Sequence, residues 1–396
     1  MKKDLKISTT SILMIMMFII QFIKFSYFSW YDVMKYGIII ISGMFIIVRI
    51  KIMLKKKYLI INGLAILFGA LTIYSSYINR NIIKERNPFL AAIIFVTTFI
   101  FFQFFIEIIV EKKQIKKMIK IFYKTTIVIT IVTDLIMFAR PNLVTIYSGN
   151  YFVGTKFSVV YLHMLLIMLY LIKNNFQFQD KFYTKKLLVL SIWSIVVGIY
   201  VQCATGVVGI ALLYLFIYII NKKEKIFVNP IVFIVVNIFC FMFIYFNQVV
   251  LRNPIISSFI VNVLGKDITL TSRTRIFEIV PKILLGNTTW GFGYATSYEI
   301  GMKLGGFPNT QNGILEWIWQ VGLPTTIIML IFFGTFLYLI KKRLNKNNRN
   351  KLVPIIAYIY VLTVLGSVEI TIGSMYFALL ILAFGISMEE DSNKIN

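Results

Sequence analysis

The stretch PFLAAIIFVTTFIFFQFFIEII, residues 88–109, contains a single charged side chain, that of Glu107. An α-helix of this length is about 33 Å long, which is enough to cross the hydrocarbon core of a bilayer. Similar apolar runs recur along all 396 residues, of which 59% are hydrophobic and 14% are charged. A soluble globular domain does not have this composition. The sequence therefore predicts an all-α, polytopic membrane protein.

The apolar runs predict about 12 transmembrane helices in a single integral membrane domain, residues 1–396. The first run follows MKKDLK without a small-residue cleavage site, so we expect a retained span and not a signal peptide. The boundary at CATG, residues 203–206, leaves open either one kinked helix or two helices joined by a tight hairpin. The predicted spans are 8–24, 33–50, 58–77, 88–109, 119–138, 158–173, 187–203, 204–220, 226–246, 313–340, 353–370 and 372–388.

The basic residues predict the orientation of these spans. With the N-terminus inside, the inner segments hold 28 of the 41 Lys and Arg residues and the outer segments hold 13. Short cytoplasmic loops are enriched in Lys and Arg, so we expect both termini in the cytoplasm and a multi-pass protein of the cytoplasmic membrane. Basic inner loops beside anionic lipids also account for most of the net charge of +25. Because no folded basic domain lies outside the membrane, we expect no nucleic acid among its partners.

Two outer loops are candidates for a functional site. Residues 247–312 form a predicted extracytoplasmic loop of 66 residues, too apolar for disorder, and residues 139–157 form the next longest. The chain has no DxD pair, HExxH motif or P-loop, so we expect neither a metal nor a cofactor. Cys203 and Cys240 both lie in predicted spans, where packing is a better interpretation than a disulfide.

The longer loop contains TSRTRIFEIVPKILLGN, residues 271–287, which predicts a short amphipathic helix along the membrane surface. Pro281 is expected to kink or interrupt it. Two arginines at a helix start clash with the positive end of the macrodipole, and a phosphate or pyrophosphate would relieve that clash. In the alternative interpretation, Arg275 pairs with Glu278 or Asp267 and Arg273 extends to lipid headgroups. The predicted apolar face consists of Ile276, Ile279, Val280, Ile283 and Leu284, opposite Arg275, Glu278 and Lys282.

Three stretches in order resemble the signature of the O-antigen ligase and polymerase superfamily. They are TSRTRIF, the glycine turn WGFGY at 290–294, and NTQNGILEWIWQVGLP at 309–324. In this resemblance Arg273 takes the place of the family arginine, and Gly322 that of a later glycine. Asn312, Leu315 and Glu316 match the second motif. The resemblance covers about 55 residues closely, together with the topology of many helices around one large outer loop.

The resemblance implies a GT-C-like membrane glycosyltransferase that acts on undecaprenyl-pyrophosphate-linked glycans at the outer face. Arg273 and Glu316 are its candidate catalytic residues, although Glu316 also fits a helix cap. Its candidate substrate-binding residues are Arg275, Gln311, Asn312, Arg140 and Lys156. Arg140 and Lys156 fit a second pyrophosphate or, alternatively, interfacial anchoring. The implied partners are lipid-linked glycans and membrane lipids, with a flippase and a chain-length regulator as further candidates.

Departures from the family pattern favour a polymerase of repeat units over a ligase. The family histidine is replaced by Gln311, which cannot take up a proton. His163, the single histidine, lies in a predicted span, where a hydrogen-bonded packing role is a better interpretation than that of a base. Glu369 is expected to face a cavity. A flippase or other transporter fits less well, because the charges gather at the outer mouth and no repeat is evident. The aromatics Trp290, Tyr294, Tyr298, Trp317 and Trp319 fit sugar stacking or an interfacial belt.

Overall fold

The computed structural model describes residues 8–25, 28, 30–146, 149–175, 181–263 and 273–389. Within these ranges the regular secondary structure is helical, and one isolated bridge joins Tyr151 and Gly154. The prediction of an all-α protein is confirmed.

The first half of the chain forms helices at the predicted spans, with one short helix in the smaller outer loop. They are α1 (Thr9–Phe22), α2 (Tyr31–Ile47), the 3₁₀-helix η1 (Ile50–Ile52), α3 (Lys56–Ile78), α4 (Pro88–Glu111), α5 (Ile115–Ala139), α6 (Leu143–Ile146), α7 (Lys156–Lys173), α8 (Lys181–Tyr200) and α9 (Ala204–Phe227).

The second half adds the helices of the large loop and the last spans. They are α10 (Pro230–Leu251), α11 (Pro254–Ser258), the π-helix η2 (Phe259–Val263), α12 (Arg273–Leu284), α13 (Ser297–Gly305), α14 (Gly313–Val321), α15 (Leu323–Arg343), α16 (Lys346–Leu365) and α17 (Ser374–Ser387).

Among the described residues, seven helices are long and apolar enough to cross a membrane: α3, α4, α5, α7, α9, α10 and α15. Helices α1 and α17 are also apolar but have 14 residues each. The chain is therefore a multi-pass membrane protein. The count of 12 spans stays a prediction.

The outer surface of the bundle is apolar, as expected of a surface that faces lipid. Ile60, Val128 and Phe239, on three different helices, are 68%, 59% and 65% exposed. Soluble proteins rarely expose apolar side chains over so many elements. The interior holds a continuous aromatic cluster, in which Phe68 and Phe377 stack with ring centroids 5.5 Å apart.

Local sequence explains where several helices begin. Asn87 accepts hydrogen bonds from the backbone N–H groups of Phe89 and Leu90, and Pro88 supplies the fixed φ of a first helical residue. Asn229 and Pro230 start α10 in the same way. At CATG the chain forms two helices, because α8 ends at Tyr200 and α9 begins at Ala204, and the two pack against each other.

The prediction of one span at 313–340 is wrong, because Gly322 separates α14 from α15. Gly322 has φ +82°, and a Cβ atom there would overlap the carbonyl oxygen of Thr289. The segment at Thr288 and Thr289, just before the glycine turn, therefore packs directly against the break between α14 and α15. There the N–H of Leu323 donates to the carbonyl of Thr288 at 2.8 Å. Only glycine allows both the left-handed turn and this close approach.

The span predicted at 353–370 is also displaced. Asn345 caps the helix start in a capping box with Asn348, so α16 begins in the basic stretch before the apolar run. The helix then ends at Leu365, and Glu369 lies in the connection to α17 instead of inside a span. This displacement puts a carboxylate on an irregular segment between two buried helices.

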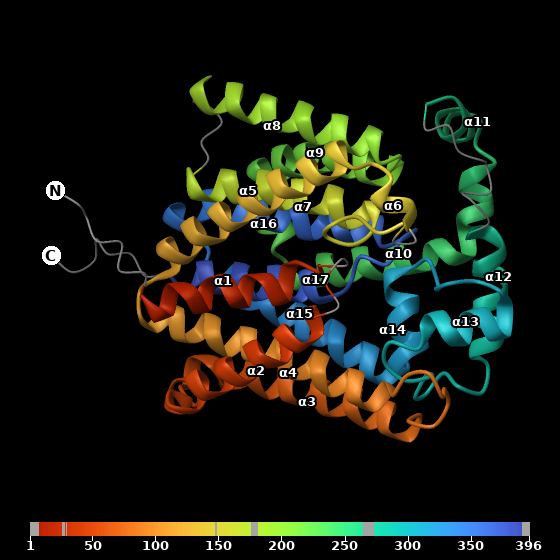
Figure 1. Ribbon diagram of the computed structural model, residues 1–396, viewed down its shortest axis with the longest axis horizontal. Coiled ribbons are helices and arrows are strands. Elements are labelled where there is room, and N and C mark those ends of the chain that lie inside the picture. Colours follow the sequence, from red (N-terminus) through yellow and green to blue (C-terminus); the bar gives the residue numbers. More distant parts are fainter. Residues whose placement is uncertain are drawn as a thin grey trace, which may run out of the picture.

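The large loop folds into helices over most of its described length. Figure 1 shows α11, α12 and α13 together at one end of the bundle. Helix α12 has the predicted amphipathic face, with Ile276, Val280 and Leu284 buried and Ile279 and Ile283 half-buried, opposite exposed Arg275, Glu278 and Lys282. Pro281 does not end the helix, which continues to Leu284.

The centre of the bundle consists of α4 and α16. Helix α4 packs on α1, α2, α3 and α17, and α16 packs on α7, α9, α10 and α17. Residues 376–387 of α17 are all buried between them. The ends of these helices on the side of the large loop surround the candidate site.

Candidate functional site

A cavity of about 1500 Å³ opens at the end of the bundle that carries the large loop. Its walls come from the ends of α1 and α16 and from the beginnings of α2, α4, α7, α9, α12 and α17. The segment 305–311, which leads into α14, also contributes. The cavity is larger than an ordinary pocket for a drug-sized ligand, so it has room for an extended substrate.

The charged side chains of this cavity are mostly basic. Its described lining contains six cationic residues, Lys24, Lys35, Arg86, Lys156, Arg273 and Arg275. It contains three acidic residues, Asp32, Glu85 and Glu369. A cavity with excess positive charge and apolar walls concentrates anionic ligands.

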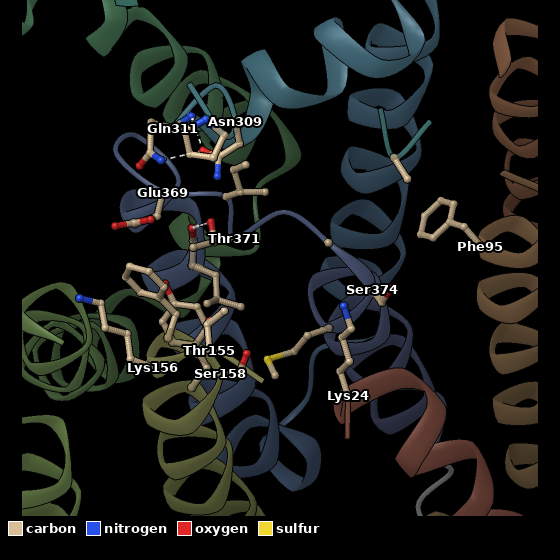
Figure 2. A pocket seen from close by; sticks show the side chains of 18 of the residues that line it. Lys24, Phe95, Thr155, Lys156, Ser158, Asn309, Gln311, Glu369, Thr371 and Ser374 are labelled. Carbon is tan, nitrogen blue, oxygen red and sulfur yellow. Dashed lines mark hydrogen bonds between the residues drawn. The ribbon is translucent and has the colours of Figure 1, made fainter. Parts of the chain in front are cut away.

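Arg273 and Glu369 form an ion pair inside the cavity. Arg273 is the first residue of α12, and one of its terminal nitrogens donates to Oε1 of Glu369. Its Nε donates to Oε1 of Gln311 at 3.0 Å, and Nε2 of Gln311 donates to Oδ1 of Asn309 at 2.7 Å. Figure 2 shows Gln311, Asn309 and Glu369 on neighbouring loop segments at one side of the cavity. Three segments far apart in the sequence therefore meet at one guanidinium group.

Glu369 has the chemistry of a proton acceptor. Burial raises its pKa above the ordinary value, and the charges of Arg273 and Lys156 and a hydrogen bond from Thr205 oppose that rise without cancelling it. A carboxylate with a raised pKa is a stronger base than an exposed one and can take up the proton of a hydroxyl group. Glu369 faces the cavity, as the sequence predicted.

Gln311 is positioned by the turn that precedes α14. Its backbone has φ +55°, and its N–H donates to Oδ1 of Asn309 at 3.1 Å. The turn directs the amide toward Arg273, where it can hold the guanidinium but cannot exchange protons. Gln311, a candidate substrate-binding residue from the sequence, thus lies beside the candidate catalytic residue Arg273 and lines the same cavity.

Asn312 and Glu316 lie outside the cavity lining, so the structure favours structural roles for both. Asn312 caps α14 through the N–H of Leu315 and donates its amide hydrogens to the carbonyls of Cys240 and Ser367, each at 3.2 Å. Glu316 accepts from the N–H and the hydroxyl of Thr310 and from the amide of Gln320, at 3.2, 2.8 and 2.7 Å. Glu316 therefore ties the turn before α14 to the helix, whereas the capping residue is Asn312.

The remaining predicted basic residues separate into two groups. Arg275 and Lys156 line the cavity, and Nζ of Lys156 donates to the carbonyl of Gln202 at 3.4 Å. Arg140 is exposed at the end of α5, away from the lining, so it does not join Lys156 in one site. Glu278 accepts from Gln248 at 2.7 Å and makes no ion pair with Arg275, while Asp267 lies outside the described residues.

His163 is a packing residue, as the sequence analysis favoured. It is buried, its Nε2 lies 3.2 Å from Oδ1 of Asp134, and its Nδ1 lies 3.3 Å from the hydroxyl of Ser194. Nε1 of Trp193 donates to the other carboxylate oxygen of Asp134 at 2.9 Å. None of these four residues lines the cavity. Cys203 and Cys240 are both buried, and Cys203 also lines the cavity.

Of the aromatic residues considered from the sequence, Tyr294 lines the cavity. It stacks on Phe95, another lining residue, with centroids 4.7 Å apart. Trp317 and Trp319 are buried in the core, Tyr298 is exposed, and Trp290 packs against Tyr74. The glycine turn packs closely against α14, because a Cβ atom on Gly291 would lie 2.5 Å from the carbonyl oxygen of Trp319. This close packing fixes the turn that carries Tyr294. Tyr294 and Phe95 are thus part of an aromatic lining that also includes Tyr31, Phe157 and Phe307.

Three cationic residues of the cavity were not predicted: Lys24, Lys35 and Arg86. Arg86 falls in an outer segment of the predicted topology, and Lys24 and Lys35 fall near the outer ends of the predicted spans 8–24 and 33–50. Basic residues are few on that side, so the presence of these three there was the available signal. They lie more than 180 residues from Arg273 in the sequence, and no local pattern connects them.

Comparisons of the chain with protein-family models, with curated proteins and with solved structures found no match.

Proposed function

We propose that this protein polymerises undecaprenyl-pyrophosphate-linked oligosaccharide repeat units on the outer face of the cytoplasmic membrane, in the synthesis of a capsule, an exopolysaccharide or an O-antigen. The observation that carries the proposal is the pair of Arg273 and Glu369 in a cavity with excess positive charge. A glycosyl transfer from a pyrophosphate needs a base for the attacking hydroxyl and cations for the leaving group. Both kinds of group face this cavity.

In the proposed step, a hydroxyl oxygen of the acceptor sugar attacks the anomeric carbon of the lipid-linked donor chain. The bond between that carbon and the pyrophosphate oxygen breaks, and undecaprenyl pyrophosphate leaves with the bonding electrons. The carboxylate of Glu369 takes up the hydroxyl proton. Arg273, Arg275 and Lys156 stabilise the negative charge that develops on the pyrophosphate.

The ion pair couples these two roles. As Glu369 takes up a proton, it becomes neutral and its attraction for Arg273 weakens. The charge of the guanidinium group is then directed at the departing pyrophosphate at the moment when negative charge accumulates there. Gln311 keeps the guanidinium group in place through Nε.

The proposal includes a GT-C-like arrangement of 12 spans with the cavity outside. The opposite end of the bundle carries Lys55 and Lys57, which pair with Glu111, and Lys351, which pairs with Glu389. This supports the orientation, because basic residues are enriched on the cytoplasmic side. Lys303 on α13 and Lys346 on α16 are both exposed. In intact cells an impermeant thiol reagent should label Lys303→Cys and not Lys346→Cys. The reverse pattern would overturn the orientation.

Deletion of the gene tests the function directly. A polymerase mutant accumulates single lipid-linked repeat units, whereas a ligase mutant accumulates polymer that is not joined to its acceptor, and a flippase mutant retains intermediates on the cytoplasmic face. We expect the first outcome. Purified protein should also form polymer from lipid-linked repeat units in the presence of EDTA, because the sequence has no acidic metal motif. A loss of activity in EDTA that Mg²⁺ or Mn²⁺ restores would contradict this mechanism.

A further inference from the structure

The cationic residues of the cavity lie in two places. One group contains Arg273 and Lys156, near Glu369. The other contains Lys24, at the end of α1, and Lys35, in the second turn of α2. In Figure 2, Lys24 extends toward Ser374, on the other side of the view from Lys156 and Glu369. The two groups therefore face one cavity from different walls.

The corner between α1 and α2 is fixed by contacts on both sides of Lys24. The hydroxyl of Tyr31 donates to the carbonyl of Ile23 at 2.5 Å, and this bond ties the start of α2 to the residue before Lys24. The amide of Gln21 donates to the carbonyl of Thr98 at 2.7 Å and ties the end of α1 to α4. Phe25 packs edge-on against Tyr31, with centroids 5.8 Å apart. The backbone that carries the two lysines is thus pre-organised.

Neither lysine forms a direct ion pair within the described part of the chain, and Lys24 is exposed. Lys24 and Lys35 make no hydrogen bond or ion pair there, although Asp32 and Glu85 also line the cavity. Lys35 is half-buried, so its ammonium group has lost part of its hydration. Asp32 on the same helix attracts the ammonium group of Lys35 and Lys24 repels it, and neither forms a direct ion pair with it. An anionic ligand between the two lysines would offset their mutual repulsion and the lost hydration of Lys35.

The surroundings of the lysines indicate which anion fits. Apolar side chains line the cavity beside them, including Ile20 and Ile23 from α1 and Leu90 and Ile94 from α4. Lysine binds phosphate groups as a point charge, and it does not require the planar geometry that arginine needs. A ligand with a phosphate head and an apolar tail, presented from the membrane, matches both features.

We propose that Lys24 and Lys35 bind the pyrophosphate of a second lipid-linked glycan, the acceptor, while Arg273 and its neighbours hold the donor. This inference rests on the proposed function, because a transfer between two lipid-linked chains requires two pyrophosphates to be bound at once. The cavity of about 1500 Å³ extends past both groups, which leaves room for the acceptor glycan to reach the donor. The two substrates would then enter from different walls and meet at Glu369.

Binding stoichiometry tests the second site without any need for turnover. The protein in phosphatidylcholine nanodiscs is titrated with undecaprenyl pyrophosphate that carries no glycan, and bound molecules are counted by native mass spectrometry. We expect two molecules on the unmodified protein and one on Lys24→Ala/Lys35→Ala. A matched control is Lys282→Ala/Lys303→Ala, which removes two exposed lysines outside the cavity and should still bind two. One molecule on the unmodified protein, or two on the Lys24/Lys35 variant, overturns the second site.

A second titration separates the two sources of lipid phosphate. Phosphatidylglycerol replaces part of the phosphatidylcholine, and its effect on undecaprenyl pyrophosphate binding is measured. We expect the second molecule to remain bound, because a pyrophosphate carries more charge than a phosphodiester. If phosphatidylglycerol displaces it from Lys24 and Lys35 at equal concentration, the two lysines form a headgroup site and the acceptor site is wrong.

Kinetics then distinguish failure of this inference from failure of the proposed function. With donor saturating, Lys24→Ala/Lys35→Ala should raise KM for a single-repeat acceptor about 100-fold, at about tenfold for each charged contact, and leave kcat close to normal. Lys24→Arg/Lys35→Arg should largely restore KM, since the charge is kept. Polymer formation with an unchanged acceptor KM rejects the acceptor site and keeps the polymerase. Two bound molecules with no polymer from either substrate reject the polymerase and keep the second site.

Discussion

The pair of Arg273 and Glu369 and the pair of His163 and Asp134 differ in their access to a ligand. The side chains of Arg273 and Glu369 are 16% and 9% exposed and face the large cavity. Those of His163 and Asp134 are 1% and 5% exposed and face Trp193 and Ser194. Both pairs are surrounded by apolar helices, and burial of the charged groups alone does not distinguish them.

The difference shows that burial of a charged pair does not by itself indicate function. The polar atoms around Asp134 are satisfied within the bundle, so the pair can hold α5, α7 and α8 in register. The pair of Arg273 and Glu369 faces an open cavity, where a substrate can compete for either partner. The predictions below test this contrast, beginning with the largest effect.

Replacement of Arg273 should have the largest effect on polymer formation. We expect Arg273→Ala to lower the rate by about 10³-fold, because it removes a cation from the leaving group and leaves Glu369 buried without its partner. Arg273→Lys should be almost as severe, since lysine lacks the planar pair of donors that reaches Gln311 and Glu369 together. Rates are measured per amount of protein in the membrane. A normal rate for Arg273→Lys would show that the guanidinium geometry is not required.

Replacement of Glu369 should have the next largest effect and should change the pH profile. Glu369→Gln keeps the shape but removes the base, so the rate should fall about 10²-fold. In the unmodified protein, activity is present while Glu369 is ionised and is lost as the pH falls through its raised pKa. The acid limb should therefore lie at higher pH than for an ordinary glutamate, and it should be absent in Glu369→Gln. An acid limb that survives unchanged in Glu369→Gln belongs to another group.

Arg273 should also influence that acid limb, because its charge lowers the pKa of Glu369. The residual activity of Arg273→Ala should show a limb at higher pH than the unmodified protein, and Arg273→Lys should show a smaller shift. If the acid limb of the pH profile lies at the same pH in all three proteins, Arg273 does not influence the pKa of Glu369 and the proposed coupling is wrong.

The sequence predicts the helical elements well and the site only in part. Apolar runs locate the helices because the hydrocarbon core imposes their length. The amphipathic face of α12 is a local pattern and is also confirmed. The break at Gly322 was missed because it depends on the approach of the carbonyl of Thr289, which no local pattern contains.

Long-range packing explains why the sequence of single segments locates the cavity only in part. Glu316 and Asn312 lie in the motif that carries the resemblance, yet the fold directs them into the base of α14. Glu369 was expected at a cavity, but its pairing with Arg273 joins residues 96 positions apart. Lys24 and Lys35 required the arrangement of α1 and α2 around the cavity. Such contacts arise from tertiary structure, and the sequence of one segment does not encode them.

The enclosed pair should affect stability and leave activity largely unchanged. Asp134→Ala removes the acceptor for His163 and for the indole N–H of Trp193, which leaves buried donors without partners. We expect the free energy of unfolding to fall by about 1–3 kcal/mol. Thermal unfolding in detergent measures the loss, and the rate per folded molecule should stay within about twofold. A large loss of rate with unchanged thermal unfolding would show that His163 and Asp134 act in function and not only in stability.

The smallest effect should come from the two basic residues of the shorter outer loop, and it should differ between them. Lys156 lines the cavity and its charge reaches Glu369, whereas Arg140 is exposed beyond the lining. Lys156 is only half-buried, so solvent screening still limits its contribution, and Lys156→Ala should lower the rate about two- to fivefold. Arg140→Ala should leave the rate unchanged, because interfacial anchoring does not depend on one side chain. Lys156→Arg serves as the control that keeps the charge and should retain the normal rate. If Arg140→Ala lowers the rate more than Lys156→Ala, the cavity does not define the substrate site on this side of the protein.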